Sequence, residues 1–310
     1  MRDDNSPFRP VSAATRWAPL SRGIALDARI GAWASQRPST QFAYEFVRFG
    51  VKQAWACLFG ALMLGLLIAT HFAYPKGAVL ARYDFLTLAA VAIQLAMLKW
   101  KLETREEAGV ILLFHAVGTV MEIFKTHVGS WVYPEASLLR IMGVPLFTGF
   151  MHASIGSFIA RCWRLFDFEF SQHPPQWALG VLALGIYVNF FTHHYIWDFR
   201  MVLFAATAIL FSRCWIYFKV WRVHRRMPLL AGFGLVAIFI WFAENIGTFT
   251  AAWVYPTQKA TWHVVSTGKL GAWFLLMIIS YALVAAVHGV KAHKPAPTAP
   301  TLMAAPVTPA

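Results

Sequence analysis

The chain has 310 residues, of which 58% are hydrophobic and only 13% are charged, and its formal net charge is +13. Soluble globular domains carry about 25% charged residues, so this composition excludes an ordinary soluble enzyme and indicates a protein embedded in a membrane. Residues 1–39 are polar and rich in arginine, and they lack the apolar core of a cleavable signal peptide. We expect them to form a disordered cytoplasmic segment.

The segment 40–52 is predicted to be an amphipathic helix at the membrane surface. Phe42, Phe46 and Phe49 recur at helical spacing, while Arg48 and Lys52 fall elsewhere on the helix. Such a pattern is typical of a helix that lies in the lipid interface.

Eight apolar runs are each long enough to cross a bilayer, which takes about 20 predominantly apolar residues. The runs are residues 53–73, 83–99, 107–124, 143–163, 176–195, 198–219, 229–248 and 269–290. We therefore expect an all-α membrane protein with eight transmembrane helices. Residues 291–310 are rich in Pro, Ala and Thr, and they are predicted to be a disordered tail.

Basic residues are distributed unevenly about these runs. If the chain crosses the membrane eight times, 20 of the 27 Lys and Arg residues fall on the side that carries both termini. The seven exceptions are Lys76, Arg82, Lys125, Arg140, Arg200, Lys259 and Lys269. Cytoplasmic loops carry an excess of basic residues, so the pattern predicts a bacterial inner-membrane protein with both termini in the cytoplasm. Contact with anionic membrane lipid explains the positive charge without a nucleic-acid partner.

One stretch of the sequence occurs twice, 122 residues apart. Residues 122–134 match residues 244–256, and both copies begin with Glu and end in Trp-Val-Tyr-Pro. Gly149 and Gly271 continue the match at the same offset, and residues 83–85 match residues 197–199 at an offset of 114. The sequence therefore predicts two four-helix repeats, residues 53–173 and 174–290.

The number of helices in each repeat determines their orientation. Because four is even, both repeats cross the membrane in the same sense, and their pseudo-two-fold axis runs along the membrane normal. This parallel arrangement places the matched polar residues at the outer ends of the helices.

Glu122 and Glu244 are the first candidates for catalytic residues. An acidic side chain within a membrane span is expensive and usually faces protein or water. The alternative is structural, because each Glu precedes an irregular Trp-Val-Tyr-Pro segment whose backbone donors need acceptors inside the membrane. The sequence leaves both interpretations open.

The helix that ends near Glu122 has a second polar feature. His115, Thr119 and Glu122 are spaced to lie on one face of the helix, and His152 on the next helix is placed to complete a site with them. A proton or substrate path through His115 and His152 is one interpretation. Histidines that hydrogen-bond between helices are the other.

Aromatic residues surround the two glutamates in the sequence. Trp131, Tyr133, Trp253 and Tyr255 stand at the level of an interfacial aromatic belt. The alternative is that they line a pocket for an elongated apolar ligand, with Asn245 as a further substrate-binding candidate.

A metal site is the weakest of the candidate sites, and we expect neither a metal nor another cofactor. Five residues at the outer helix ends are of types that bind divalent ions, but the helical His pairs and Cys/His spacings that mark such sites are absent. They are His71, Asp84, His193, His194 and Asp198. The three cysteines, Cys57, Cys162 and Cys214, are scattered and form no metal or disulfide pattern.

Several long motifs resemble a bacterial family of integral membrane proteins. They are Phe-Lys-Thr-His-Val-Gly-Ser-Trp-Val-Tyr-Pro-Glu at 124–135, Asn-Phe-Phe-Thr-His-His at 189–194 and Phe-Ala-Glu-Asn-Ile-Gly-Thr-Phe-Thr at 242–250. Over about residues 45–290 the chain resembles the family called domain of unknown function 817. This resemblance implies an integral membrane protein without an assigned activity.

A fainter resemblance concerns carotenoid end-group enzymes, the membrane lycopene cyclases and the carotenoid hydratases. The turn from Gly129 to Tyr133 and the later Gly-Val-Pro-Leu at 143–146 are similar to a module of these enzymes. The resemblance implies that Glu122 is an acid that protonates a polyene. The cyclases carry acidic residues after Pro-Leu, where this chain has Phe147-Thr148-Gly149.

Three functions fit these features. The first is a membrane enzyme in which Glu122 and Glu244 carry out acid–base chemistry on an apolar lipid or isoprenoid. The second is a proton-coupled transporter of small molecules, because duplicated helical bundles are common in carriers. The third is a membrane scaffold without chemistry.

Overall fold

The computed structural model describes residue 26 and residues 29–294, and the described chain is mostly helical. It divides into two compact units, one comprising residues up to Trp55 together with Val220–Val223, the other comprising Ala56–Lys219 and the chain from His224 onward. Most of the predicted N-terminal segment and of the predicted C-terminal tail lies outside the described residues.

The smaller unit contains most of α2 (Pro38–Ala56), which includes the predicted interfacial segment. Phe42 and Phe46 are exposed and their rings stack, with 6.5 Å between centroids. The ring of Tyr44 packs edge-on against Trp221, at 5.1 Å between centroids. An exposed aromatic stripe agrees with a helix at a lipid surface, which remains a prediction.

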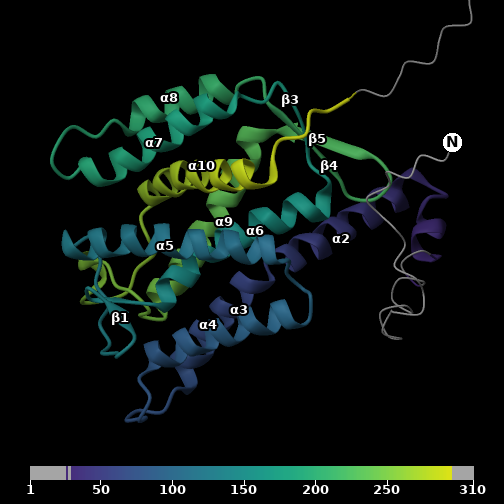
Figure 1. Cartoon of the computed structure of the whole chain (residues 1–310). Helices are drawn as coiled ribbons and strands as arrows, with labels where there is room; N and C mark the ends of the chain where they lie inside the picture. The colour runs from purple at the N-terminus through teal and green to yellow at the C-terminus, as the bar shows by residue number, and fades with distance from the viewer. Residues whose placement is uncertain (1–25, 27–28, 295–310) are drawn as a thin grey trace, which may run out of the picture. The chain divides into compact units, whose positions relative to one another are not determined.

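The larger unit contains eight α-helices among its described residues, and the longest connections between them follow α5, α8 and α9. They are α3 (Leu58–Ala73), α4 (Arg82–Lys99), α5 (Arg105–His127), α6 (Phe147–Phe166), α7 (Gln176–Thr192), α8 (Arg200–Phe211), α9 (Leu229–Phe249) and α10 (Gly268–His288). Figure 1 shows α3 and α4 as a pair on one side, α7 and α8 as a pair on the other, and the remaining four helices between them. The largest buried cluster of this unit joins residues of α5, α6, α7, α9 and α10, and two smaller clusters join α3, α4 and α6.

Helices α5 and α6 approach each other closely at glycines. A Cβ atom at Gly149 would lie 2.4 Å from Nδ1 of His115, and one at Gly156 would lie 2.6 Å from the ring of Phe114. Small residues allow helix backbones in membranes to pack closely, and here they make room for a histidine and an aromatic ring.

Membrane-crossing potential is uneven among the described helices. By length and composition, α5 from Glu107, α9 and α10 could each cross a membrane, and a fourth span is possible if α2 and α3 together form one broken span. Helices α7 and α8 are apolar but shorter. Together with the composition, these helices indicate a membrane protein.

The prediction of an all-helical chain is wrong for residues 212–219. Helix α8 ends at Phe211, and β4 (Trp215–Lys219) pairs with β3 (Glu169–Ser171) and β5 (His224–Pro228) in an antiparallel sheet. Aromatic and β-branched residues in Trp-Ile-Tyr-Phe favour a strand as well as an apolar helix, so hydrophobicity alone did not distinguish them.

Two other β elements depart from the predicted organisation. Strands β1 (Arg140–Ile141) and β2 (Val144–Pro145) form a short hairpin before α6. At the C-terminal end, Ala292 forms a parallel bridge with Phe170, so residues 291–293 are paired where the sequence predicted a disordered tail.

Candidate functional site

The two Trp-Val-Tyr-Pro segments meet in the folded chain. Val132 and Val254 form an antiparallel bridge, with N–H···O distances of 3.0 Å and 2.9 Å between their main chains. Each segment follows the helix that carries its glutamate, α5 or α9. The bridge therefore brings the ends of these two helices together and pairs the backbone N–H and C=O groups of Val132 and Val254.

Glu122 is enclosed by three side-chain donors. Its carboxylate accepts hydrogen bonds from Nε1 of Trp131 and from the Tyr133 hydroxyl, and it lies 2.7 Å from Nε2 of His152 on α6. The distance to Trp131 is also 2.7 Å, and Glu122 is only 6% exposed. The predicted polar face thus places Glu122 and His152 in direct contact.

Glu244 has a similar pair of donors. Its carboxylate accepts hydrogen bonds from Nε1 of Trp253 at 3.0 Å and from the Tyr255 hydroxyl. Burial and the neighbouring carboxylates raise the pKa values of both Tyr133 and Tyr255, so both phenols stay protonated and donate. The structural interpretation expected each glutamate to accept hydrogen bonds from backbone N–H groups. Each instead accepts them from the Trp and Tyr side chains of the segment that follows it.

A cavity of about 280 Å³ opens beside Glu122. Helices α5, α6, α7 and α10 supply most of its wall, and Tyr255 reaches it from the second Trp-Val-Tyr-Pro segment. Of the residues that the sequence singled out, the wall includes Glu122, Trp131, His152, His193, His194 and Tyr255. The lining does not include Glu244, His115, Tyr133, Trp253 or Asn245.

Three basic residues on the cavity wall were not predicted as site residues. They are Lys125 on α5, Arg200 on α8 and Lys269 on α10. Nζ of Lys125 lies 2.8 Å from Nε2 of His194, and burial followed by the charge of Lys125 lowers the pKa of that histidine. All three belong to the seven basic residues that fall outside the cytoplasmic bias of the sequence, and that exception is the signal that could have identified them.

Two predicted residues have neighbours away from the cavity. The ring of His115 packs on Phe150 at 4.5 Å between centroids, and its buried Nδ1 atom has no hydrogen-bond partner among the described residues. The amide of Asn245 accepts from the backbone N–H of Val265 at 2.9 Å and donates to the carbonyl of Trp241. Asn245 thus anchors the segment that leads into α10.

The five weak metal candidates are held in separate polar contacts. Asp84 accepts hydrogen bonds from the backbone of Leu138 and Leu139, and Asp198 accepts from Asn189 and from the backbone of Arg200. Burial opposes ionisation of Asp198, but its hydrogen bonds lower its pKa. His71 lies 3.2 Å from the carbonyl oxygen of Thr250, while His193 and His194 lie beside Lys125. Of these contacts, that of Asp198 with the N–H of Arg200 lies at the start of α8, whereas Asp84 holds the loop before β1.

Within the described residues, one group has ligand atoms close enough together to hold a metal ion, and it contains none of these five candidates. The group is Asp167, Glu169 and His224. There Nζ of Lys291 lies 2.8 Å from Glu169 and 3.2 Å from Asp167. The group is thus an ion-pair cluster that fastens the C-terminal segment to β3.

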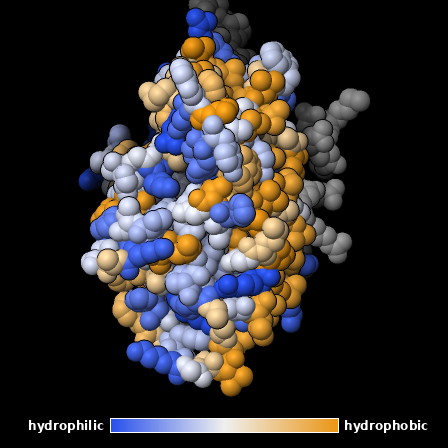
Figure 2. Space-filling model, turned by 90° about the vertical axis from the view of Figure 1, so that its left-hand side faces the viewer, coloured by the Kyte–Doolittle hydropathy of each residue, from blue (hydrophilic) through white to orange (hydrophobic). Residues whose placement is uncertain are grey.

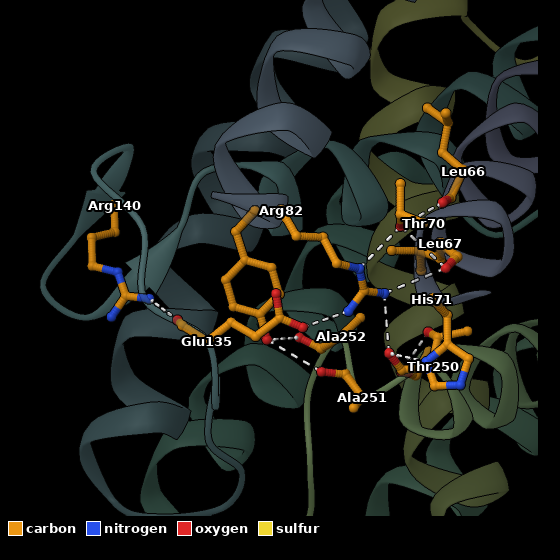
Figure 3. A network of polar contacts seen from close by, with 12 residues as sticks. Leu66, Leu67, Thr70, His71, Arg82, Glu135, Arg140, Thr250, Ala251 and Ala252 are labelled. Carbon is orange, nitrogen blue, oxygen red and sulfur yellow. Dashed lines mark hydrogen bonds and ion pairs between the residues drawn. The ribbon is translucent and has the colours of Figure 1, made fainter. Parts of the chain in front are cut away.

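Arg82 connects four segments of the larger unit, as Figure 3 shows. Its guanidinium donates to Thr70 Oγ1 at 3.0 Å, to Glu135 at 2.6 Å, and to the carbonyl oxygens of Leu67 and Thr250 at 3.3 Å and 3.0 Å. Arg82 is 8% exposed and comes from the same group of outer basic residues. Its role in the fold was not predicted.

Comparison with known proteins identifies one family and one similar protein. The model of the family described as "Protein of unknown function (DUF817)" matches residues 45–281. The "Uncharacterized protein YoaT" of Bacillus subtilis (strain 168) is 44% identical over 251 residues, which cover 81% of this chain and 94% of that protein. No solved structure matches significantly. The predicted resemblance is therefore confirmed, and the chain belongs to the DUF817 family.

Proposed function

We propose that this protein is a multi-pass membrane enzyme that carries out acid–base chemistry on a lipid or isoprenoid substrate. The observation that carries the proposal is the contact between Glu122 and His152, 2.7 Å apart, on the wall of the cavity. A carboxylate and an imidazole in contact can pass a proton between them, and both reach the space where a substrate would lie. The faint resemblance to carotenoid end-group enzymes supports an isoprenoid.

The proposed architecture is eight membrane helices in two parallel four-helix repeats. Its support is the repeated order of helices, α3 to α6 and α7 to α10, and the matching contacts of the repeated motif. Trp131 and Tyr133 bond Glu122 as Trp253 and Tyr255 bond Glu244. Under this architecture the positive charge places both termini in the cytoplasm and the cavity towards the outer face.

Figure 2 supports the placement of helix ends in water. It shows one end of the molecule, on which hydrophilic residues gather over the face while hydrophobic residues lie along one margin. A polar end bordered by an apolar flank suits a bundle whose helix ends meet water and whose sides meet lipid.

The two glutamates have different proposed roles. Glu122 and His152 exchange the proton with substrate, and Glu244 positions Tyr255, whose hydroxyl it accepts and whose ring lines the cavity. His115 supports the neighbouring α6 helix through its contact with Phe150. The cavity also has apolar wall residues, including Met121, Phe190 and Trp273.

The size of the cavity limits what it can hold. Ligand pockets occupy roughly 300–1,000 Å³, and this cavity of about 280 Å³ lies just below that range. We therefore expect it to enclose the reacting end of a long substrate, with the remaining apolar part in contact with the membrane.

The test compares lipid extracts from cells that express the wild type, Glu122→Gln or His152→Ala. We expect at least one lipid species to be formed only with the wild type, and both variants to reduce its amount by about 100-fold, as is typical for loss of a proton-transfer group. Mass spectrometry of the extracts and of the purified proteins measures the product and any retained substrate.

The control is Glu169→Gln, which changes a carboxylate on β3 that is not part of the cavity wall. It should leave product formation unchanged. Identical lipid profiles for wild type and Glu122→Gln would refute the enzyme proposal. Loss of proton-dependent flux with unchanged lipids would instead indicate the carrier, and loss of assembly would indicate the scaffold.

A further inference from the structure

We infer that the cavity binds the anionic phosphate group of its ligand, as a phosphate monoester or diphosphate. Lys125, Arg200 and Lys269 line the cavity, and Glu122 is the one acidic residue among the described residues of its lining. With the histidines neutral, three positive charges minus one negative charge leave a formal charge of +2 on the wall. This inference rests on the proposed function for the cavity as a ligand site, but not on proton transfer by Glu122.

Lys125 carries a charge that the described residues do not neutralise by an ion pair. It is 5% exposed, and its Nζ atom lies 2.8 Å from Nε2 of His194 and 4.2 Å from the ring centroid of Phe190. Neither neighbour is an anion. A buried ammonium group without a counterion is costly in free energy. An anion bound in the cavity would supply the counterion that Lys125 lacks among the described residues.

Lys269 on α10 is placed in a similar way on the cavity wall. Its Nζ atom lies 4.4 Å from the ring centroid of Tyr255 and 5.7 Å from that of Trp131, and no carboxylate of the described chain forms an ion pair with it. Aromatic faces attract a cation but leave its N–H groups without acceptors. These donors remain available to phosphate oxygens.

Arg200 completes the basic group but differs from the two lysines. One of its guanidinium nitrogens lies 3.1 Å from Asp198, so part of its charge is already paired. Arg200 also lines the cavity, and a guanidinium can bond a carboxylate and a phosphate at once because it has five N–H donors.

The proposed repeat provides an independent comparison, because it identifies the space that is related to the cavity by the pseudo-two-fold axis. At offsets of 122 and, for Arg200, 114, the cavity residues Asn189, Arg200, Lys269 and Trp273 correspond to Leu67, Leu86, Phe147 and Met151. Those four residues belong to one packed apolar cluster, which also contains Tyr133, Ala252 and Trp253.

The position that matches Lys125 is Gly247, and a Cβ atom there would lie 2.1 Å from the ring of Trp253. The ring of Trp253 thus packs beside α9 at the position where α5 carries the side chain of Lys125. Each of the two related spaces is formed by residues of both repeats, and they differ because one is filled and the other is open and basic. A polar, charged cavity at only one of two related positions supports a ligand site and not a general feature of the fold.

The test measures binding of inorganic pyrophosphate to the full-length protein in detergent, by thermal unfolding at constant ionic strength set with chloride. We expect pyrophosphate to raise the unfolding temperature saturably. Lys125→Met and Lys269→Met should each weaken this binding at least tenfold. Lys259→Met is the matched control, because Lys259 is exposed and is not part of the cavity wall, and it should bind as the wild type does.

A second arm distinguishes a lipid phosphate from a free one. Nanodiscs of phosphatidylcholine that contain either phosphatidate or uncharged diacylglycerol are compared for their effect on the unfolding temperature. Stabilisation by phosphatidate that both lysine variants abolish supports a lipid phosphate, whereas stabilisation by pyrophosphate alone supports a soluble phosphate.

The unliganded variants keep the test decisive. Lys125→Met should be at least as stable as the wild type, because it removes a buried charge without a counterion. Wild-type affinity in both lysine variants, equal weakening by Lys259→Met, or no stabilisation by either probe would overturn the inference. Anion binding that survives in Glu122→Gln without any effect on lipid products would support the inference while refuting the acid–base proposal.

Discussion

Replacing Arg82 with methionine is expected to lower the free energy of unfolding by about 2–4 kcal/mol. The change removes donors from Thr70, Glu135 and the carbonyl oxygens of Leu67 and Thr250, and it leaves these acceptors unpaired in a mostly buried site (Figure 3). The side chain of Glu135 is 35% exposed, so water can solvate its carboxylate after the ion pair is lost. The decrease in unfolding free energy is therefore smaller than for the loss of a fully buried ion pair. Titration with a denaturing detergent measures the difference.

Arg140→Met is the matched control for this prediction. Arg140 donates to Ser137 at 2.9 Å and to the carbonyl oxygen of Glu135 at 2.6 Å, within one partly exposed loop. Since it joins no separate helices, its loss should cost less than about 1 kcal/mol, in the range of a single intramolecular hydrogen bond. Equal destabilisation by the two substitutions would contradict the role assigned to Arg82.

Gly247→Ala is the second substitution with a large expected effect, a loss of about 1–3 kcal/mol from overpacking. The new methyl group would meet the ring of Trp253 at 2.1 Å and force it to move. That movement would lengthen the 3.0 Å hydrogen bond from Trp253 to Glu244 and disturb Tyr255, which shares the same acceptor. Tryptophan fluorescence and the unfolding midpoint in mild detergent measure both consequences.

Gly180→Ala on α7 offers the opposite expectation. A Cβ atom there meets nothing within 4 Å, so alanine should stabilise the helix by about 0.5–1 kcal/mol through its lower conformational entropy in the unfolded chain. A Gly247→Ala protein as stable as Gly180→Ala would show that the ring of Trp253 is not fixed against α9.

Much of the helical framework could be predicted from hydrophobicity and from the repeated motif. Glu122, Trp131 and Tyr133 were singled out from their pattern, and they lie within hydrogen-bonding distance of one another. His152 on the next helix was named as a residue that could complete the site, and it lies 2.7 Å from Glu122. These are local or periodic features, and a single sequence expresses them directly.

The cavity could not be predicted in the same way. Its basic residues come from α5, α8 and α10, which are far apart in the chain, and no periodic pattern connects them. The sequence did show that Lys125 and Lys269 depart from the cytoplasmic bias of basic residues. That bias does not indicate which other residues their side chains lie beside in the folded chain. Strand β4 was predicted to be part of a helix, because a short run of aromatic and β-branched residues is compatible with a buried helix as well as with a strand.

The bridge between Val132 and Val254 is reciprocal, since each residue gives one N–H and receives one at its carbonyl oxygen. A half-length chain with a single such segment could complete both bonds only by pairing with a second copy of itself, as the identical patches of a symmetric dimer do. Joining the halves in one polypeptide frees each to change alone. Independent change of the two repeats would allow one of the two related spaces to be filled with aromatic and aliphatic side chains while the other remained an open, basic cavity.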